Sequence, residues 1–437
     1  MKARGYGNLK GAESLSVILP SYNEQNNVGE LIRRVKSQLQ ALNIKFEVIV
    51  VDGGSRDNTV KEAAKEGAKV IIQKSKGYGG ALLEGFALAK GDYVLTMDSD
   101  MSHDPVFIKN LWMQRSYADI IIASRYVKGG KAKMSLSRTF LSKSLNAFFA
   151  RALSLPLKDL SSGYRMYKKE VVGESLQLKG TDFNILQEIV VQAYNNGWII
   201  KEEPFYYRPR KFGKSKAKLA KFACSYLITL GKMWKMRNSI EAADYDDRAY
   251  NSKILPQRLW QRARHKVIMS FLAQSFRPSE KPLIVDIGCG SNKLIQQLNN
   301  SIGIDIMLKK LMFLRSKNKN LLQASIFNLP LKSDSIDCII CSEVIEHLQK
   351  GEQPFLEITR VLKRGGILIL GTPDYSRASW HIIEWIYSKI LPNAYADEHI
   401  SPYSRKSLKK LLGKHGFNVV GSRYVFGSEL ILRAIKK

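Results

Sequence analysis

Short apolar runs alternate with amphipathic segments along both halves of the chain. The runs have the length of strands, and the segment after the first of them, residues 26–43, places its apolar residues at helical spacing. The strand-like runs are residues 14–20, 46–52, 68–73, 92–98, 282–290, 301–307, 320–325, 336–343 and 365–372. Alternating strands and helices indicate parallel sheets covered by helices, so the predicted fold class is α/β in both halves.

A polar segment of mixed charge, roughly residues 238–262, separates the two series. We therefore predict one domain at residues 1–240, a linker at 241–263 and a second domain at 264–437. No run of 18 apolar residues is present, and the first residues, MKARGYGNLKGAES, lack the apolar centre of a signal peptide. The segments 222–234 and 380–391 are apolar and amphipathic, which fits a helix on a membrane surface or one packed on a core.

The chain is strongly basic, with a net charge of +30. Both parts contribute: 39 basic minus 21 acidic residues give +18 over residues 1–240, and 30 minus 18 give +12 over the rest. This balance favours anionic partners such as a membrane surface, phosphorylated substrates or nucleic acid. The four cysteines are too few and too scattered for a disulfide framework and fit a cytosolic protein. Cys338 and Cys341 have the spacing of a redox pair or half a zinc site, but they lie in an apolar strand-like run, which favours buried packing.

Three strand-like runs of the first half end in polar chemistry, where ligands bind in parallel sheets. The motifs are PSYNE at residues 20–24, a turn that follows Asp52, and DSD at the end of the fourth run. Asp98 and Asp100 would hold Mg²⁺ or Mn²⁺, because two carboxylates this close repel each other unless a cation lies between them. Lys76 precedes a glycine-rich helix entry and suits a phosphate.

Together these motifs resemble glycosyltransferase family 2, and within it the dolichyl- or polyprenyl-phosphate mannose synthase branch, over roughly residues 14–237. The motifs that carry the resemblance are VILPSYNE, VVDGGSRDNT, KGYGGALLEGFALAKGD, DSDMSHDP, SRYVKGG, LKDLSSGYRMYKKEVV and RKFGKSK. The resemblance implies a GT-A fold, a GDP- or UDP-sugar donor and an inverting transfer to a polyprenyl or dolichyl phosphate. The sequence differs from the family pattern at Gly53, where a second aspartate is usual, and at Ser102, where glutamine is often a third metal ligand.

The resemblance also implies roles for individual residues of the first domain. The nucleotide would be contacted by Pro20, Tyr22, Glu24 and Asp52, and the metal would be held by Asp98 and Asp100. The acceptor phosphate would be bound by Arg125 and Arg138. The site would be closed by Arg210, Ser215 and Lys216. A lipid phosphate is already ionised and needs positioning rather than a base. A hydroxyl acceptor would need a carboxylate base instead, for which Asp182 and Glu188 are available, although a structural role for Glu188 is an equal alternative. His103 is interpreted as a structural partner of the metal loop.

Two basic runs without any acid support a lipid-phosphate acceptor. Eight basic residues lie in the stretch from Arg125 to Lys158, and seven in the stretch from Arg208 to Lys221, the end residues included. A solvated face is the alternative reading of such a run. Each run, however, contains an amphipathic helix-like segment, at 139–155 and 219–234, and basic amphipathic helices suit an anionic bilayer.

The second half carries a different glycine motif. Gly288 and Gly290 follow an apolar run, but Lys293 stands where the dinucleotide fingerprint has a third glycine, which argues against NAD and FAD. Asp305 ends the next run, 19 residues after Asp286, and could accept hydrogen bonds from ribose hydroxyls.

Residues 264–437 resemble a class I S-adenosylmethionine-dependent methyltransferase. The motifs are DIGCG, GIDIM, IFNLPLKSDSIDCIICSEVIEHL and RVLKRGGILILGTP. The resemblance implies that Asp286, Gly288, Gly290 and Asp305 bind the cofactor and that Glu343 lines the site. It departs from the family at Ser325, where an acidic residue often reaches the adenine amine. Glu346 and His347 are interpreted either as catalytic residues or as helix-packing residues.

The sequence thus predicts a bifunctional, metal-dependent enzyme that is peripheral at the cytosolic face of a membrane. One domain would transfer sugar to a polyprenyl phosphate or lipid-linked glycan, and the other would methylate an acceptor that the sequence does not name. The alternatives are a nucleic-acid-binding methyltransferase with a recruited first half, or a chain in which one domain only senses its ligand. No nucleic-acid partner is expected, because the basic runs surround the sugar-transfer motifs and no aromatic–basic stacking motif is present. The sequence indicates no oligomeric state.

Overall fold

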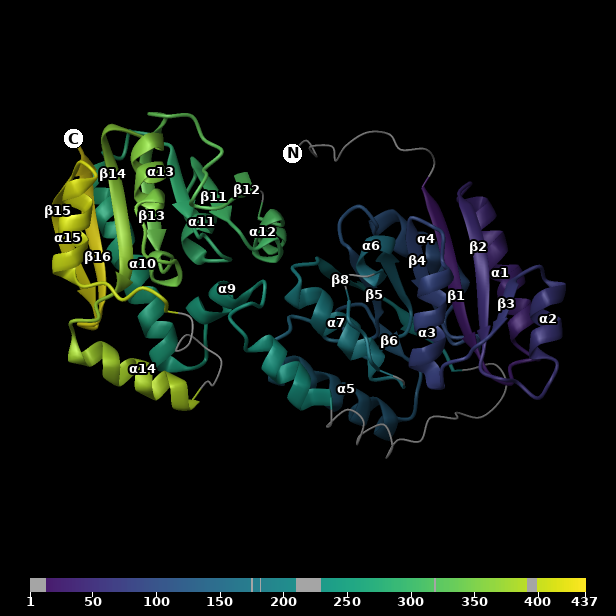
Figure 1. The fold of residues 1–437 in the computed structure, drawn as a ribbon. Coiled ribbons are helices and arrows are strands. Elements are labelled where there is room, and N and C mark those ends of the chain that lie inside the picture. Colours follow the sequence, from purple (N-terminus) through teal and green to yellow (C-terminus); the bar gives the residue numbers. More distant parts are fainter. Residues whose placement is uncertain (1–12, 174–175, 181, 210–228, 318–319, 391–398) are drawn as a thin grey trace. The chain divides into compact units, whose positions relative to one another are not determined.

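The computed structural model describes residues 13–173, 176–180, 182–209, 229–317, 320–390 and 399–437 (Figure 1). It divides into two compact units, residues 1–194 with 198–237 and residues 195–197 with 238–437. The division therefore falls at Arg237, close to the predicted boundary. The segment 241–263, predicted as a linker, is instead part of the second unit, where it contains one short helix and the start of a long one.

A seven-stranded, mostly parallel sheet forms the centre of the first unit (Figure 1). Its strands, in spatial order, are β3 (Lys69–Ile72), β2 (Lys45–Asp52), β1 (Ser14–Ser21), β4 (Tyr93–Thr96), β7 (Arg165–Lys168), β5 (Ile120–Ser124) and β8 (Ile200–Pro204). A separate pair consists of β6 (Lys131–Ala132) and β9 (Tyr206–Tyr207). The helices are α1 (Val28–Ala41), α2 (Thr59–Lys65), α3 (Gly77–Leu88), η1 (Pro105–Phe107), α4 (Ile108–Gln114), α5 (Leu136–Ala152), α6 (Lys169–Val172) and α7 (Ile185–Asn195).

Strand β1 shows why the apolar runs are continuous. Leu15, Val17 and Leu19 belong to one buried cluster, which α1 covers, while Ile18 belongs to another, which α3 covers. Both faces of the strand are buried, so most side chains on both faces are apolar. Ser16 is an exception: it is fully buried and donates a hydrogen bond to Glu47 Oε1 at 2.6 Å. The parallel register pairs Ser21 with Asp52, which brings the polar carboxyl ends of β1 and β2 to the same edge of the sheet.

Strand β7 breaks the parallel order, because it runs antiparallel to both β4 and β5. Its first residue, Arg165, is fully buried and donates hydrogen bonds to the carbonyls of Ser162, Leu160 and Leu186 at 2.7 Å each. A buried guanidinium has to satisfy its donors, so this side chain ties the loop before β7 to helix α7.

The second unit has its own seven-stranded sheet. The strands, in spatial order, are β12 (Asn320–Gln323), β11 (Ser301–Asp305), β10 (Ile284–Ile287), β13 (Ile336–Ser342), β14 (Leu362–Pro373), β16 (Glu429–Lys436) and β15 (Phe417–Val425). The first five are parallel, and β16 is antiparallel to both β14 and β15. The helices are α9 (Tyr245–Tyr250), α10 (Leu255–Ser275), α11 (Lys293–Gln297), α12 (Leu308–Arg315), η2 (Ile345–His347), α13 (Gln353–Val361), α14 (Ala378–Ile390) and α15 (Arg405–Lys414).

The two cysteines of β13 pack in the core, as predicted. Cys338 and Cys341 are both fully buried and belong to different apolar clusters, because residues three apart in a strand face opposite sides of the sheet. Burial raises the pKa of both thiols, which keeps them protonated and unreactive. Neither a shared metal site nor a redox pair is compatible with this placement.

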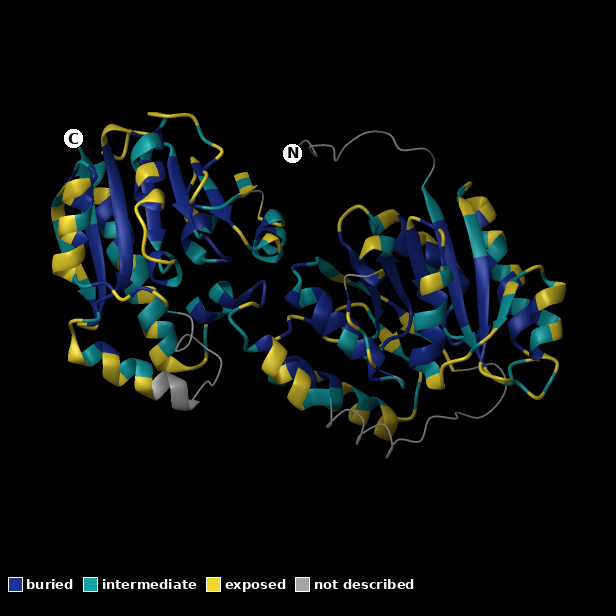
Figure 2. Ribbon diagram, in the orientation of Figure 1, coloured by how far each residue is buried: buried dark blue, intermediate teal, exposed yellow. Residues whose placement is uncertain are grey.

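Helices α5 and α14 contain several exposed residues (Figure 2), and some of these are large and apolar. On α5 these are Leu136, Phe140, Leu141 and Phe148, and on α14 Ile382 and Trp385. Trp380 of α14 is buried, so the described part of the segment 380–391 is only partly a core helix. Residues 222–228 of the other apolar segment lie outside the described residues, and its end has Met233 buried and Trp234 exposed. Among the described helices, none combines the length and the hydropathy that a membrane span requires.

Candidate active sites

The carboxyl ends of β1 and β4 border a cavity of about 440 Å³ in the first unit. Five of the predicted site residues line it: Pro20, Tyr22, Glu24, Asp98 and Asp100. They come from two chain segments far apart in the sequence, which the parallel pairing of β1 with β4 brings to one edge of the sheet. This edge is where open α/β sheets bind ligands.

The turn after β4 fixes the two aspartates. Met101 has a φ of +65°, an unfavourable value for a residue with a side chain, and the Ser102 N–H donates to Asp100 Oδ1 at 3.0 Å. His103 is buried, and its Nδ1 accepts the Asp98 N–H at 2.9 Å, so its proton lies on Nε2, 3.8 Å from Asp98 Oδ2. The histidine thus supports the turn, as the sequence interpretation expected.

The electrostatics of this turn suit a divalent cation. Burial raises the pKa of Asp98, and the nearby charge of Asp100 raises it further, so a cation at this point would relieve the repulsion. Carboxylate oxygens are the ligands that Mg²⁺ and Mn²⁺ prefer. The residues present therefore fit the metal implied by the resemblance.

Asp52 lies at the carboxyl end of β2, as the sequence predicted, but its carboxylate is hydrogen-bonded within the protein. It is fully buried, and its carboxylate accepts hydrogen bonds from the N–H groups of Gly54 and Ser55 at 2.9 and 2.7 Å and from the Ser55 hydroxyl. It does not line the cavity, whereas the neighbouring Gly53 does. Asp52 therefore shapes the turn at the end of β2. Lys76 is the exposed N-cap residue of α3, next to the cavity residue Gly77.

The predicted acceptor residues are not gathered around the cavity. Arg125 forms a two-pronged ion pair with the fully buried Asp159, with both nitrogen–oxygen distances at 2.7 Å. Arg138 lies on the exposed side of α5. Arg210, Ser215 and Lys216 lie outside the described residues.

Glu188 has a local structural role and does not line the cavity. Its carboxylate accepts hydrogen bonds from the N–H groups of Lys179 and Gly180, the latter at 2.7 Å. The alternative that the sequence left open for this residue, a structural one, agrees with these contacts.

Sequence reasoning missed the aromatic pair beside the aspartates. The Tyr78 hydroxyl lies 3.4 Å from Asp98 Oδ1, and its ring stacks on Phe183 with centroids 4.3 Å apart. Both residues line the cavity. A Cβ at Gly163 would lie 2.6 Å from the same hydroxyl and 3.2 Å from Asp98 Oδ1, so a side chain there would displace Tyr78. Tyr78 lies inside the motif KGYGG, which the sequence analysis interpreted only through its glycines.

In the second unit, a cavity of about 640 Å³ collects all five residues predicted to bind the cofactor: Asp286, Gly288, Gly290, Asp305 and Glu343. Asp305 Oδ2 accepts the Gly290 N–H at 2.8 Å, which ties the end of β11 to the turn after β10. Burial raises the pKa of Asp286 to about 7. A ligand with positive charge would stabilise this carboxylate, and S-adenosylmethionine has both a sulfonium and an ammonium group.

The two glycines of the turn are required sterically. Both have positive φ values, +70° for Gly288 and +49° for Gly290. A Cβ at Gly288 would lie 2.2 Å from Val344 Cγ2, and one at Gly290 would lie 2.3 Å from Asp246 Oδ2. These contacts fit a turn that brings the backbone close to a ligand.

Asp246 and Lys310 are further residues at this turn that the sequence analysis did not single out. Asp246 Oδ2 accepts the Ser291 N–H at 3.0 Å and pairs with Lys310 Nζ at 3.0 Å. Both residues line the large cavity. Asp246 lies in the segment predicted as a linker, which the sequence analysis described only as polar and of mixed charge.

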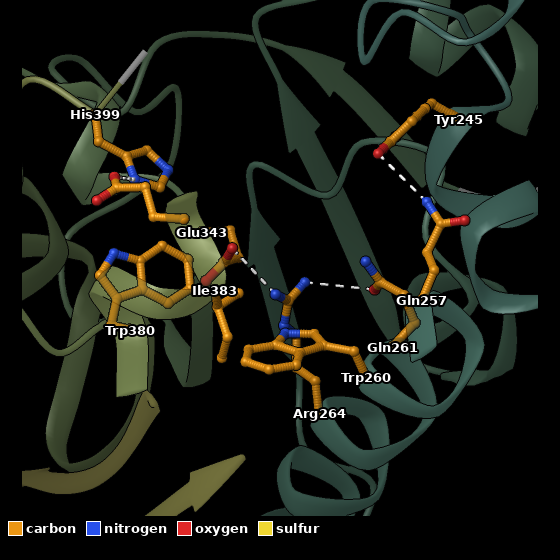
Figure 3. A pocket seen from close by; sticks show the side chains of 10 residues that line it. Tyr245, Gln257, Trp260, Gln261, Arg264, Glu343, Trp380, Ile383 and His399 are labelled. Atoms are coloured by element: carbon orange, nitrogen blue, oxygen red, sulfur yellow. Dashed lines mark hydrogen bonds and ion pairs between the residues drawn. The ribbon is translucent and has the colours of Figure 1, made fainter. Parts of the chain in front are cut away.

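A second, smaller cavity of about 50 Å³ shares Glu343 with the large one (Figure 3). Aromatic side chains line it, among them Trp260 and Trp380, together with His399. Arg264 pairs with Glu343 at 3.0 Å and with the fully buried Glu429 at 2.5 Å. An aromatic wall with a few polar groups is typical of a small-molecule site.

Comparison with known proteins gives the class of each unit. Residues 16–176 match the model of glycosyl transferase family 2, and residues 285–370 match the model of a methyltransferase domain. The chain therefore carries a family 2 glycosyltransferase domain followed by a methyltransferase domain. The α/β class predicted for both is confirmed.

Two relatives resemble the first domain in particular. A dolichol-phosphate mannosyltransferase of Pyrococcus furiosus is 36% identical over 238 residues, which are 52% of this chain and 65% of that protein. The low-salt glycan biosynthesis hexosyltransferase Agl6 of Haloferax volcanii is 33% identical over 208 residues, 46% of this chain and 49% of that protein. The chain thus spans less than two thirds of the length of either relative.

Among solved structures, a glucosyl-3-phosphoglycerate synthase from Mycobacterium tuberculosis in complex with Mn²⁺, UDP and phosphoglyceric acid matches with 20% identity and a TM-score of 0.43. The match covers 51% of this chain and 78% of that one. This level of similarity supports no inference about the site.

Proposed function

We propose that the first domain transfers a sugar from a GDP- or UDP-sugar to a polyprenyl or dolichyl phosphate at a membrane surface. The observation that carries this proposal is the cavity at the ends of β1 and β4, with Pro20, Tyr22 and Glu24 on one side and Asp98 and Asp100 on the other. The similarity to a dolichol-phosphate mannosyltransferase supports the lipid-phosphate acceptor, and the similarity to a glycan biosynthesis hexosyltransferase supports sugar transfer.

The residues of the cavity have different roles in the proposed inverting transfer. Asp98 and Asp100 would hold Mg²⁺ or Mn²⁺, and this ion would supply charge neutralisation for the departing diphosphate. The Tyr22 ring, which is exposed at the cavity edge, packs against the nucleotide. The acceptor phosphate is ionised at neutral pH, so the protein needs to orient it and needs no base.

Helix α5 supports the membrane part of the proposal. It exposes Leu136, Phe140 and Phe148, and it carries Arg138 and Lys143 in a run without acidic residues. Exposed apolar side chains beside cations suit the boundary between lipid headgroups and acyl chains, where each cation adds about 1 kcal/mol of attraction to an anionic surface. The proposed location is the cytosolic face of the membrane.

We further propose that the second domain binds S-adenosylmethionine in the 640 Å³ cavity and transfers its methyl group to an acceptor. Asp305, at the end of β11, accepts hydrogen bonds from the ribose hydroxyls, and the Gly288–Gly290 turn approaches the amino-acid part of the cofactor. The match to a methyltransferase model over residues 285–370 supports this assignment.

The test of the first activity is a transfer assay with the full chain, radiolabelled GDP- and UDP-sugars and polyprenyl phosphate in detergent. Label is expected in the organic phase only when lipid phosphate and Mg²⁺ or Mn²⁺ are both present. Label that stays water-soluble with every donor would reject the lipid acceptor. For the second domain, calorimetry with S-adenosylmethionine is expected to give one site per chain, and an Asp305→Ala variant should lose it.

A further inference from the structure

Three side chains of the second unit converge beside the proposed methyl-donor cavity. Glu346 and His347 lie in η2, directly after β13, and His399 comes from a distant part of the chain. One ligand atom from each, a carboxylate oxygen or an imidazole nitrogen, lies within 4.8 Å of the other two. Bonds of about 2.0–2.2 Å to one cation place its ligands up to about 4.4 Å apart, so small side-chain rotations close this set around an ion.

The backbone holds His399 against η2. The Ser401 N–H donates to the Glu346 carbonyl at 3.0 Å, and the Ser401 hydroxyl donates to the Leu348 carbonyl at 2.6 Å. Ser401 is itself fully buried. The approach of the two histidines, whose ring centroids are 4.9 Å apart, is therefore built into the fold.

The carboxylates at this point have buried oxygens without a counterpart. Glu346 is fully buried, and its Oε2 accepts a hydrogen bond from Thr372 at 3.1 Å. Its Oε1, like the Oε1 of Glu343, is buried and has no hydrogen-bond partner among the described residues. Leaving such lone pairs unsatisfied is costly, and a cation would satisfy them. Glu343 also has a φ of +60°, and a strained backbone of this kind often marks a functional position.

A relay of hydrogen bonds orients His399 for metal binding. The Tyr375 hydroxyl lies 3.2 Å from Glu384 Oε1 and 2.7 Å from His399 Nδ1. An ionised Glu384 can only accept, so the hydroxyl donates to it and accepts the Nδ1 proton of the histidine. The remaining nitrogen, Nε2, then carries the lone pair that a metal requires. Ligating histidines commonly have their other nitrogen fixed in this way.

The donor set indicates which cations fit. Two imidazoles and a carboxylate favour first-row divalent ions such as Mn²⁺, Fe²⁺, Co²⁺ or Zn²⁺ over Mg²⁺ and Ca²⁺, which prefer oxygen alone.

We propose that Glu346, His347 and His399 bind a divalent transition-metal ion, and that open positions on the ion bind an oxygen of the methyl acceptor. Metal binding stands without any assumption about the reaction, whereas the role in acceptor binding rests on the methyl transfer proposed above. The location fits this role, because His347 lines the large cavity and His399 lines the aromatic one. Glu343 lines both cavities, and Figure 3 shows it with His399 at the aromatic one.

The reaction assigned to this site is O-methylation of a hydroxyl. The bound hydroxyl loses its proton to water, which the positive charge of the ion facilitates. The oxygen then forms a bond to the methyl carbon, and the carbon–sulfur bond breaks with its electron pair passing to sulfur. The products are the methyl ether, S-adenosylhomocysteine and one proton, so no oxidant or other reactant is needed.

The experiment uses the full chain with Asp98→Ala and Asp100→Ala, which removes the metal site proposed in the first domain. Mn²⁺ binding is measured from the loss of the free-ion signal in electron paramagnetic resonance. One Mn²⁺ per chain is expected. Adding Glu346→Gln or His399→Ala should abolish binding, while Glu352→Gln, an exposed glutamate paired with Lys414, should leave it unchanged.

Folding of the variants is monitored by thermal unfolding with and without Mn²⁺. The ion should raise the melting temperature in the Asp98→Ala/Asp100→Ala background and not after Glu346→Gln. A background protein that binds neither Mn²⁺ nor Zn²⁺, or one that retains its ion after both Glu346→Gln and His399→Ala, would overturn the site.

Open coordination positions are tested separately by proton relaxation of water. Bound Mn²⁺ that has exchangeable water ligands should shorten the relaxation time of the water protons. A bound ion without this effect would have all its coordination positions filled by the protein, and this result would overturn the acceptor role. Failure of S-adenosylmethionine to bind in calorimetry would reject the methyltransferase proposal and leave the Mn²⁺ titration unaffected. The two failures are therefore distinguishable.

Discussion

Replacing Arg125 by alanine should destabilise the first unit strongly, because this side chain neutralises a buried acid. Its guanidinium contacts both oxygens of Asp159 at 2.7 Å, and Asp159 has no exposed side-chain surface. Removing one partner of a buried ion pair costs about 3–5 kcal/mol. For a unit of this size each kcal/mol lowers the melting temperature by about 2–4 °C, so the expected decrease is about 6–20 °C.

Scanning calorimetry of the full chain measures this change, and Arg138→Ala is the matched control. Arg138 belongs to the same acid-free basic run but is exposed on α5, so its loss should change the stability by less than about 0.5 kcal/mol. If Arg125→Ala melted within a degree of the parent protein and instead raised the acceptor concentration needed for transfer, the structural role would be refuted. Arg125 would then be an acceptor residue, as the family resemblance implies.

The same pair has a defined pH dependence. Burial alone would raise the pKa of Asp159, but the charge and hydrogen bonds of Arg125 hold it below the ordinary value of 3.8. A carboxyl with a lowered pKa stabilises the fold above its unfolded pKa, and this contribution is lost as the pH falls through the folded value. Asp159→Asn should therefore be much less stable than the parent at pH 7, and the difference should shrink below about pH 4. A difference that stays constant down to pH 2 would contradict the ion-pair account.

Three further predictions concern the two sites. Asp100→Ala should reduce sugar transfer by more than about 100-fold while S-adenosylmethionine binding is kept, and transfer that persists in excess chelator would argue against the metal. Arg138→Ala should raise the acceptor concentration needed for half-maximal transfer about 10- to 150-fold, with unchanged nucleotide binding. Arg138→Lys should partly reverse this increase, and transfer assays on the same lipid measure both. Gly290→Ala should weaken methyl-donor binding at least about 10-fold in calorimetry, because its Cβ would lie 2.3 Å from Asp246 Oδ2; an unchanged affinity would show that the turn adapts.

The sequence was sufficient to locate the strand ends and the chemistry on them. Continuous apolar runs indicate strands with both faces buried, and parallel strands of this kind bring the residues at their carboxyl ends to one edge of the sheet. For this reason Asp98 and Asp100 were placed at a cavity correctly, and so were Asp286 and Asp305. His103 could also be interpreted from its position, shortly after the paired acids.

Contacts between distant segments could not be predicted in the same way. The partner of Arg125 lies 34 residues further along the chain, and nothing in either local sequence indicates the pairing. The antiparallel strand β7 follows a loop rather than a helix, a topology that hydrophobic patterning does not reveal. From the sequence alone, Asp246 belongs to a polar linker. In the structure it lies in α9, and its carboxylate accepts a hydrogen bond from Ser291 at the glycine turn of the second unit.

Each unit buries its own apolar clusters, so the two sites lie in separate units of one chain. This arrangement determines how many copies of each site a cell contains. Because both sites are translated from one message, they occur in equal numbers whatever the rate of synthesis. A change in expression therefore scales both capacities together and cannot alter their ratio. Only a change inside one unit, in its ligand concentration or in its own residues, can adjust one capacity relative to the other.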